Sequence, residues 1–490
     1  MKIAVLADLH LSDNFNTVKM TALQWALQEV QAGQCDLICC AGDLTAEGSD
    51  KQTDEVLRRL QSCPVPFCST PGNAELRRFS DGRNARKFAV DAAAGVPVIL
   101  IDTALDEPTP ADLAKLAALP AQSGCLLVTH NPIRQWSESA QQIAREAMQR
   151  NAVTAVIAGH SHHDADGILR GLDPDKASGG APMFAVMEQQ PDGSWLRSDV
   201  VMPGISPEEW SDSEREAFRR RIGISTMWEE VAAFEFATEH RIENVELRME
   251  LNCPPELPVL IEKWRAAGGK VLSLHLPELR LDDPEDKLHK YVLLACKLQC
   301  NRVTLHVPKV TAAGFAAVQE QLLDKLSGDM QMLLQNNIVV GIENLHTTGS
   351  ANTFETRNFG CCIDECRSWI ELLRKRFATD KIGFHLDIGH ARNNAPISGR
   401  ENLSDWYERM GNLINGWHWH QVEHREGKFF NHCPLKGFYD KLIVLSGFFM
   451  AQAAGQLRNA PIFLEARTWA GNVESYQQLM QNLKKERLGK

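Results

Sequence analysis

The first 160 residues carry short apolar runs separated by amphipathic stretches. One apolar stripe with helical spacing passes through Met20, Leu23, Leu27 and Val30. Short runs that are apolar on both faces are typical of buried parallel strands. We expect such strands at 3–7, 37–41, 98–101, 126–130 and 153–160. Strands that alternate with helices predict a layered α/β domain.

The same rhythm starts again after residue 221. Eight short apolar runs are expected to form strands, at 222–225, 244–247, 271–276, 302–307, 338–343, 382–387, 415–420 and 461–465. Helical patterns lie between them, for example at 286–298 and 315–326. Eight βα units within about 250 residues predict a (β/α)8 TIM barrel. A second doubly wound sheet is the alternative, but eight evenly spaced units favour closure.

A polar and charged segment separates the two halves. It follows a predicted hairpin, with strands at 183–187 and 195–202 around the turn Pro191-Asp192-Gly193. The segment suits a linker or a short connecting helix. We therefore predict a first domain at 1–203, a linker at 204–221 and a barrel domain at 222–490.

Composition narrows the class of protein. Apolar residues make up 44% of the chain and charged residues 23%, as in ordinary soluble proteins. No apolar run approaches the roughly 20 residues of a membrane span, and Asp8 interrupts the only stretch resembling a signal peptide. The 13 cysteines show neither CxxC spacing nor a secreted disulfide pattern, so we expect reduced thiols and a cytoplasmic protein. The net charge of −11, without a long basic block, argues against broad attraction to nucleic acid.

Polar side chains follow the strands of the first half. An Asp-x-His pair alone, such as Asp8 and His10, would suit a strand-end cap beside a solvent-facing histidine. Five successive strand ends, however, carry groups able to bind a metal, namely Asp8, His10, Asp43, Asn73, His130, His160 and His162. Glycines before three of them allow the tight turns that would aim these side chains into one cleft. Oxygen and nitrogen ligands without thiolates suit Mn²⁺, Fe or Zn²⁺.

This series resembles the calcineurin-like metallophosphoesterases, whose pattern is D-x-H, G-D, G-N-H, H and G-H-x-H. The resemblance implies two metals with Asp43 as the bridge, one on Asp8, His10, Asp43 and His162, the other on Asp43, Asn73, His130 and His160. Such metals, about 3.5–4 Å apart, would clamp a phosphate and supply hydroxide for in-line attack. One position departs from the pattern, because Ala74 stands where the family often has a histidine that protonates the leaving group. Glu75, His163 and Asp164 are the alternatives for that role.

Strand ends in the second half carry a second set of such groups: His275, His306, Glu343, Asp387, His390, His418, His420 and Glu465. Because the active sites of TIM barrels lie at the carboxyl ends of the strands, we expect these side chains to meet. So many carboxylates and imidazoles would repel one another or stay protonated unless a cation joined them. Taken singly, His275, His306 and His420 would also suit loop histidines bonded to the backbone.

The barrel half resembles the xylose-isomerase-like superfamily, which includes sugar and sugar-phosphate isomerases and epimerases, and endonuclease IV. The matching motifs are Glu343-Asn344, His385-Leu-Asp387-Ile-Gly-His390, His418-Trp-His420 and Leu464-Glu465-Ala-Arg467. The isomerase branch implies a metal on Glu343, Asp387, His418 and Glu465. Glu343 and Glu465 would then move a proton beside a carbonyl, and His390 would hold the substrate.

The endonuclease branch of this superfamily implies more metals. It would hold three, drawing also on His275, His306, His390 and His432. Asn431 stands where that branch has an aspartate. The expected cofactors of the barrel are therefore one to three divalent metals, Mn²⁺ or Zn²⁺, and the motifs identify a superfamily but leave the reaction open.

Three functions remain under consideration. The first is a bifunctional enzyme in which a phosphoesterase is joined to an isomerase- or epimerase-like barrel and acts on a small phosphorylated molecule. The second is a nucleic-acid processing phosphodiesterase with an endonuclease IV-like barrel, which the acidic charge opposes. The third is a non-catalytic metal-binding scaffold, which Ala74 suggests. No membrane partner is expected, and the substrate, the metals and the oligomeric state stay open.

Overall fold

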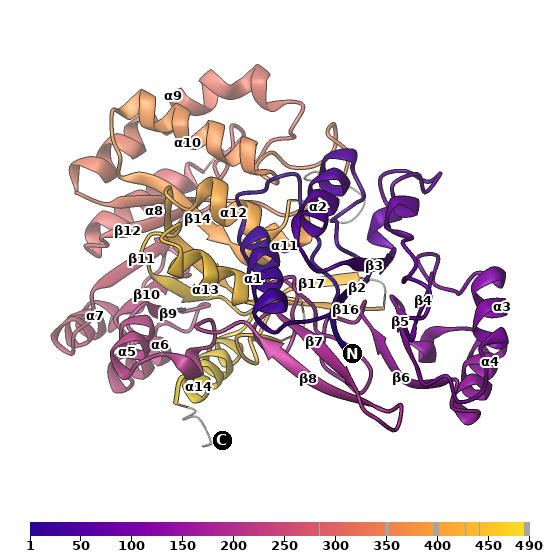
Figure 1. The fold of residues 1–490 in the computed structure, drawn as a ribbon. Coiled ribbons are helices and arrows are strands. Elements are labelled where there is room, and N and C mark those ends of the chain that lie inside the picture. The colour runs from indigo at the N-terminus through magenta and orange to yellow at the C-terminus, as the bar shows by residue number, and fades with distance from the viewer. Residues whose placement is uncertain (284, 348–351, 395–400, 427, 441, 485–490) are drawn as a thin grey trace. The chain divides into compact units, whose positions relative to one another are not determined.

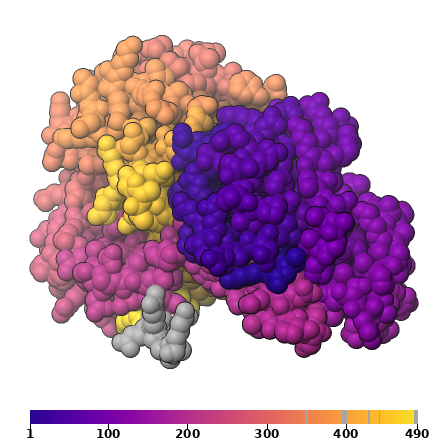
Figure 2. Space-filling view, in the orientation of Figure 1, coloured from indigo at the N-terminus to yellow at the C-terminus, as the bar shows by residue number. Residues whose placement is uncertain are grey.

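Two folding units account for the alternating strands and helices of the sequence (Figure 1). The computed structural model describes residues 1–490 except 284, 348–351, 395–400, 427, 441 and 485–490. The first unit comprises Met1–Ser206 with Val444–Gly447, and the second comprises Pro207–Ile443 with Phe448–Lys490. Figure 2 shows their surfaces, with the first unit indigo to magenta and most of the second pink to yellow.

The first unit is built on two sheets. One has the strand order β3-β2-β1-β7-β8, and the other has the order β4-β5-β6. Strands β1 to β3 are parallel to one another, as are β4 to β6, whereas β7 is antiparallel to both β1 and β8. The elements are β1 (Lys2–Leu6), α1 (Val18–Ala32), β2 (Leu37–Ala41), α2 (Asp50–Ser62), β3 (Phe67–Thr70), β4 (Val98–Ile101), α3 (Pro110–Ala118), β5 (Cys125–Thr129), α4 (Glu138–Gln149), β6 (Val153–Ala158), β7 (Met183–Gln189) and β8 (Trp195–Val201).

The alternation of side chains along β1 explains the layering of this unit. Ala4 and Leu6 belong to an apolar cluster with α1 and α2. Ile3 and Val5 point the other way, into a cluster with β5 and β6. A third cluster joins the far face of β5 to α3 and α4. The result is a four-layer α/β/β/α arrangement, which confirms the predicted layered α/β domain and brings several strand ends to one edge.

The second unit is a closed barrel of parallel strands in the order β9-β10-β11-β12-β13-β14-β15-β18, which confirms the predicted TIM barrel. Its strands are β9 (Ile222–Ser225), β10 (Asn244–Leu247), β11 (Val271–His275), β12 (Arg302–His306), β13 (Val339–Glu343), β14 (Ile382–Asp387), β15 (Ile414–Trp419) and β18 (Ile462–Leu464). Its helices are α5 (Asp212–Arg219), α6 (Glu230–Glu239), α7 (Leu257–Ala266), α8 (Lys287–Lys297), α9 (Phe315–Gln335), α10 (Ile363–Phe377), α11 (Ile388–Asn394), α12 (Leu403–Met410), α13 (Ser446–Ala453) and α14 (Trp469–Lys484).

Two features of this unit concern its connections. The segment expected as a linker contains helix α5, which begins with a capping box formed by Ser211 and Glu214. A hairpin that the apolar pattern did not predict, β16 (Gln421–Arg425) with β17 (Lys428–Cys433), follows β15.

In the described part of the chain, no helix is long and apolar enough to span a bilayer.

The barrel strands alternate between apolar and polar side chains. Val245, Leu272 and Leu274 are buried apolar residues, whereas their neighbours Glu246 and Ser273 hydrogen-bond to each other at 2.9 Å. Thr304 on β12 donates to the same carboxylate of Glu246 at 2.6 Å. Because side chains on a strand alternate in direction, the polar set faces one side of the barrel wall and the apolar set packs on the other.

Candidate metal centres

Several polar residues that follow the strands of the first unit adopt a left-handed backbone conformation. Asp8 and His10 follow β1 with φ angles of 53° and 48°, and Asp43 follows β2 with a φ of 53°. His160 and His162, after β6, have φ angles of 68° and 53°. This conformation is unfavourable for residues other than glycine, and such strain concentrates at functional sites.

One group of side chains surrounds His10. Its Nε2 atom lies 3.3 Å from His162 Nε2, 3.5 Å from Asp43 Oδ2 and 4.0 Å from Asp8 Oδ1. His162 Nε2 lies equally far, 4.0 Å, from that oxygen of Asp8. The structure therefore brings together the four residues predicted for the first metal.

A second group surrounds Asn73. Its Oδ1 atom lies 3.1 Å from both His130 Nε2 and His160 Nδ1, and these two nitrogens are 3.3 Å apart. His130 Nε2 also lies 3.3 Å from Asp43 Oδ1. The two oxygens of Asp43 thus face different groups, the arrangement that a bridging ligand requires.

The donor sets fit divalent cations. Burial lowers the pKa values of His10 and His162, which favours the neutral imidazole that can bind a metal. Burial alone would raise the pKa of Asp43, but His130 and hydrogen bonds to the carboxylate hold it below the usual range. The buried nitrogen and oxygen atoms lie too close together for hydrogen bonds to join all of them. A cation between them therefore stabilises the arrangement.

Glu75, one of the three residues considered for the acid role, is a hydrogen-bond acceptor in this structure. Its buried carboxylate accepts hydrogen bonds from the backbone N–H groups of Asp43 (2.9 Å), Gly72 (2.8 Å) and Thr45 (2.8 Å), and from the Thr45 hydroxyl (2.8 Å). Both oxygens are therefore committed to holding the two ligand loops. Ala74 donates its N–H to Asp43 Oδ1 at 2.7 Å and so orients the bridging carboxylate.

The other two residues considered for the acid role have partners outside both groups. His163 Nδ1 lies 2.8 Å from the Ser161 carbonyl oxygen, and Asp164 pairs with Arg170 at 3.1 Å. Neither side chain lies among the contacts of the two groups described above.

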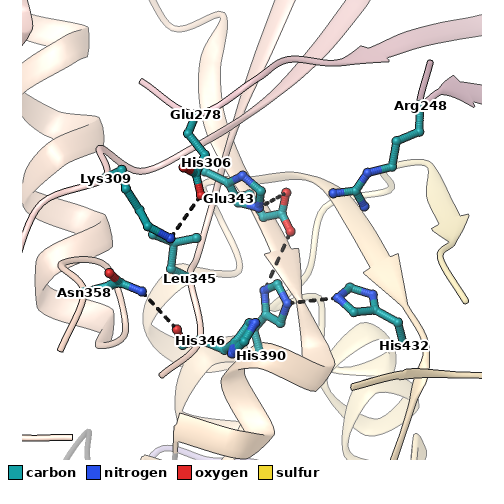
Figure 3. A pocket seen from close by; sticks show the side chains of 10 residues that line it. All are labelled: Arg248, Glu278, His306, Lys309, Glu343, Leu345, His346, Asn358, His390 and His432. Atoms are coloured by element: carbon teal, nitrogen blue, oxygen red, sulfur yellow. Dashed lines mark hydrogen bonds and ion pairs between the residues drawn. The ribbon is translucent and has the colours of Figure 1, made fainter. Parts of the chain in front are cut away.

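Glu343 at the end of β13 centres one cluster of the barrel (Figure 3). Its Oε2 atom lies 3.1 Å from His275 Nε2 and 3.4 Å from His306 Nε2, the last residues of strands β11 and β12. Glu343 and His306 line a cavity of about 150 Å³ together with Arg248, Lys309 and His432. Lys309 pairs with Glu278 at 3.0 Å, and Arg248 forms an ion pair with Glu465.

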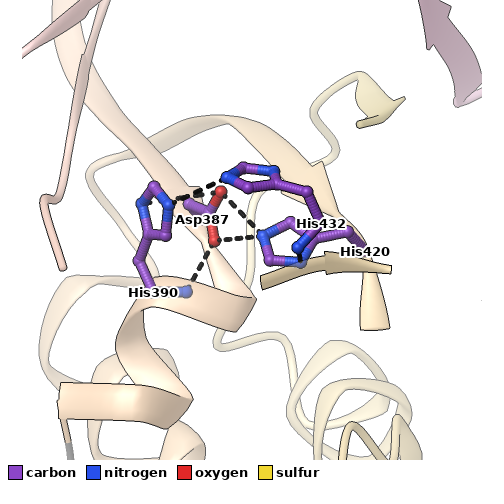
Figure 4. Close-up of side chains that lie close together, drawn as sticks. All are labelled: Asp387, His390, His420 and His432. Atoms are coloured by element: carbon purple, nitrogen blue, oxygen red, sulfur yellow. Dashed lines mark hydrogen bonds and ion pairs between the residues drawn. The ribbon is translucent and has the colours of Figure 1, made fainter. Parts of the chain in front are cut away.

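Asp387 at the end of β14 centres another cluster (Figure 4). His420 Nε2 lies 3.0 and 3.1 Å from its two oxygens, and the backbone N–H of His390 donates to Oδ1 at 2.7 Å. His432 Nε2 lies 3.3 Å from His390 Nε2. Ligand atoms of these four residues lie within 4.8 Å of one another. Asn431 accepts a hydrogen bond from Asn393.

His418 lies between these clusters and is completely buried. Its Nδ1 atom lies 3.1 Å from both Glu343 Oε1 and Glu465 Oε2, and its Nε2 atom lies 2.6 Å from Glu246 Oε1. The predicted set of Glu343, Asp387, His418 and Glu465 is thus close enough to share a metal. His420 is equally well placed beside Asp387, so the structure offers both histidines of the His-Trp-His motif.

Sequence reasoning missed three charged residues of the barrel site. Arg248 and Lys309 follow strand ends, a position that could have identified them, but a metal site predicts carboxylates and imidazoles there and not cations. Glu246 lies inside β10, and its only signal was a carboxylate at the inward position of a predicted buried strand. Candidate metal sites with buried histidine and carboxylate ligands are therefore present in both units.

Part of the chain matches a known protein family. A model of the calcineurin-like phosphoesterase family matches residues 1–164. The comparison with curated proteins gave no match. Similar solved structures include a D-tagatose 3-epimerase-like protein, with 17% identity over 54% of this chain and 97% of that one and a TM-score of 0.39.

Two further solved structures belong to differently named enzymes. The 3-keto-D-glucoside 4-epimerase of E. coli is 13% identical over 54% of this chain and 98% of its own, with a TM-score of 0.37. Endonuclease IV of Thermus thermophilus is 16% identical over 54% of this chain and 99% of its own, with a TM-score of 0.36. On the family match and the observed strand order, this chain carries a calcineurin-like phosphoesterase domain at residues 1–164, followed by a (β/α)8 barrel.

Proposed function

We propose that the first domain is a metal-dependent phosphoesterase that hydrolyses a phosphomonoester or phosphodiester of a small molecule. The observation that carries this proposal is the position of Asp43, whose Oδ2 lies 3.5 Å from His10 Nε2 and whose Oδ1 lies 3.3 Å from His130 Nε2. One carboxylate facing two histidine groups is the arrangement that suits a pair of Mn²⁺, Fe or Zn²⁺ ions.

The residues of the chain have distinct roles in this proposal. Asp8, His10 and His162 hold one cation, Asn73, His130 and His160 hold the other, and Asp43 joins them. When bound, the pair of cations supplies Lewis-acid stabilisation of the phosphoryl group and lowers the pKa of water. Glu75 fixes the loops that carry Asp43 and Asn73 through its four hydrogen bonds. Since Ala74 cannot donate a proton, the domain favours substrates whose leaving group needs none.

For the barrel we propose an isomerase- or epimerase-like activity on a related sugar or sugar phosphate, with one to three Mn²⁺ or Zn²⁺ ions. Support comes from Glu343 and Glu465, whose carboxylates both lie 3.1 Å from His418 Nδ1 and therefore flank one point. Two such carboxylates suit removal of a proton beside a carbonyl and its return. His390 holds the substrate at the mouth, where it lines the same cavity as Glu343.

Aryl phosphate esters test the first proposal. Metal-stripped protein is reloaded with Mn²⁺ or Zn²⁺ and assayed on p-nitrophenyl phosphate and bis(p-nitrophenyl) phosphate. We expect hydrolysis by the wild type and by the exposed-carboxylate control Asp54→Asn, and loss of hydrolysis in Asp43→Asn. Absence of turnover on both esters, or equal rates in Asp43→Asn, would refute the proposal and favour the non-catalytic scaffold.

Solvent-deuterium exchange tests the barrel proposal. A panel of ketoses and ketose phosphates is incubated in D₂O, and NMR follows exchange at the carbon beside the carbonyl. Glu343→Gln and Glu465→Gln should abolish exchange, whereas Glu320→Gln, an exposed residue on α9, should not. Exchange that persists in both carboxylate variants would contradict the assignment.

Nucleic-acid processing is the second candidate, and one observation favours it. His275 and His306 group with Glu343, and His390 and His432 group with Asp387. His418 and Glu465 form a third group with these two carboxylates, so three neighbouring clusters could hold three ions. Cleavage of an abasic oligonucleotide that Glu343→Gln abolishes would establish this alternative. For either activity we propose a cytoplasmic location, because the 13 cysteines lack the spacing of a secreted disulfide framework.

A further inference from the structure

Two charged side chains that belong to neither metal group are buried behind the loop that carries Asp8 and His10. Lys19 on α1 and Asp173 are both 0% exposed. The Lys19 ammonium donates to Asp173 Oδ2 at 2.8 Å and to the His10 carbonyl oxygen at 3.2 Å. The backbone N–H of Asp173 donates to the Asp8 carbonyl oxygen at 2.7 Å. The two residues therefore bond to each other and to both ends of the ligand loop.

The strained Asp8–His10 loop is held through its N–H groups as well as through its carbonyl oxygens. The N–H groups of Asp8 and His10 already donate to the carbonyl oxygens of Gly42 (3.0 Å) and Asp43 (2.9 Å). Lys19 and Asp173 bind the carbonyl oxygens of the same two residues. Asp8 and His10 each have a left-handed φ, which costs about 1–2 kcal/mol in an L-residue. The loop thus depends on its neighbours to keep both side chains aimed at one point.

Asp173 is also held by hydrogen bonds that do not involve Lys19. Its Oδ1 accepts the N–H of Asp175 at 2.9 Å, and its carbonyl oxygen accepts the N–H groups of Lys176 (3.1 Å) and Ala177 (2.9 Å). A buried ion pair is expensive to desolvate and adds little net stability compared with apolar residues of the same size. The directional bond from the Lys19 ammonium to the His10 carbonyl oxygen, in contrast, is one that an apolar side chain could not provide. The Asp173 carboxylate in turn fixes the position of that ammonium.

We propose that Lys19 and Asp173 are positioning residues that hold the Asp8–His10 loop in the geometry that binds a divalent metal. This inference rests on the proposed metal site of the first domain, but not on its phosphoesterase activity. Partners of this kind, which orient ligands without touching the metal, typically change metal affinity by about 10- to 100-fold when they are removed.

Mn²⁺ binding to the full-length, metal-stripped protein tests the inference. His10→Ala identifies the part of the calorimetric isotherm that belongs to this loop, because the barrel binds metal separately. Lys19→Met and Asp173→Asn should weaken that part by about 10- to 100-fold and reduce the metal-induced rise in melting temperature. Lys19→Arg, which keeps the charge and the donors, should recover part of the affinity.

Lys2→Met is the matched control. Lys2 donates to the Gly33 carbonyl oxygen at 2.8 Å near the opposite end of β1, so its loss removes a similar bond far from the ligands. Wild-type Mn²⁺ affinity in folded Asp173→Asn and Lys19→Met would overturn the inference, even if both proteins melted earlier. If Lys19→Met fails to fold, the Mn²⁺ affinity of Asp173→Asn alone tests the inference. The two claims fail independently. Unchanged Mn²⁺ affinity in the variants contradicts the inference, whereas a metal-loaded wild type that does not hydrolyse phosphate esters contradicts only the proposed function.

Discussion

His418 Nε2 lies 2.6 Å from Glu246 Oε1, and both side chains are 0% exposed inside the barrel. Ser273 and Thr304 donate to the other oxygen of Glu246 at 2.9 and 2.6 Å. The opposite nitrogen of His418 faces Glu343 and Glu465. One imidazole ring therefore connects a buried carboxylate below the site with the two carboxylates that are proposed to transfer a proton.

Glu246→Gln should disturb this connection while preserving the shape of the side chain. The amide cannot neutralise a charged His418, although its oxygen can still accept from Ser273 and Thr304. Removing one partner of a buried ion pair typically costs about 3–5 kcal/mol. We expect a loss of that order in the denaturant unfolding of the barrel, together with weaker deuterium exchange. The exposed variant Glu320→Gln should leave both unchanged.

The same pair predicts how the stability of metal-free protein depends on pH. Burial alone would lower the pKa of His418, but Glu246 and Glu343 raise it to about 10. Because the folded pKa exceeds the unfolded value of about 6.5, the stabilisation is complete below pH 6.5 and is lost as the pH rises towards 10. Chemical unfolding of EDTA-treated protein across this range should show the decline, and Glu246→Gln should flatten it. A flat profile in the wild type would contradict the prediction.

The strand-end ligands could be predicted because parallel strands end at one edge of a sheet. Asp8, Asp43, His130 and His160 were found in this way, and the structure brings them together. The register of β14 against β15 likewise sets Asp387 beside His418. Local sequence therefore carries the position of a ligand whenever a buried strand and a turn define it.

The supporting residues could not be predicted, because their roles depend on contacts between distant segments. Lys19 meets Asp173 across 154 positions, and Glu246 meets His418 across 172. The β16–β17 hairpin was also missed, and it carries His432, which was expected only through family resemblance. Whether His418 or His420 serves as the metal ligand depends on the depth of each side chain in the barrel, which a His-x-His pattern does not encode.

Gly42→Ala should damage the proposed metal centre of the first domain more than the same substitution at a comparable glycine elsewhere. A Cβ at Gly42 would lie 2.6 Å from Gly72 N and 2.8 Å from His130 Nδ1, and its φ is +79°. Gly95 has a similar φ of +87°, but a Cβ there meets nothing within 4 Å. Gly95→Ala therefore measures the backbone strain alone. We expect Mn²⁺ affinity and ester hydrolysis to fall in Gly42→Ala and to persist in Gly95→Ala, and equal behaviour of the two variants would contradict this.

The rate of hydrolysis should depend steeply on the leaving group. Ala74 is fully buried and has no proton to give, and Glu75 is committed to four hydrogen bonds. A general acid typically contributes about 10²- to 10⁴-fold, so alkyl esters should fall behind aryl esters by more than binding alone explains. The measurement is kcat over a series of aryl and alkyl phosphate esters that differ in the pKa of the leaving group. Equal kcat values across the series would show that another group donates the proton.

Glu75→Gln should weaken both ligand loops of the first domain at once. The carboxylate accepts only backbone N–H and hydroxyl donors, from Asp43, Thr45 and Gly72. An amide would turn an NH₂ group towards one or two of these donors, and a buried unsatisfied donor costs about 1–3 kcal/mol. Because Asp43 is the proposed bridge between two cations, we expect lower Mn²⁺ affinity as well as a lower melting temperature. Glu146→Gln, an exposed change of the same chemistry on α4, should alter neither. A Glu75→Gln protein that melts earlier but binds Mn²⁺ like the wild type would show that Glu75 stabilises the fold without positioning the ligands.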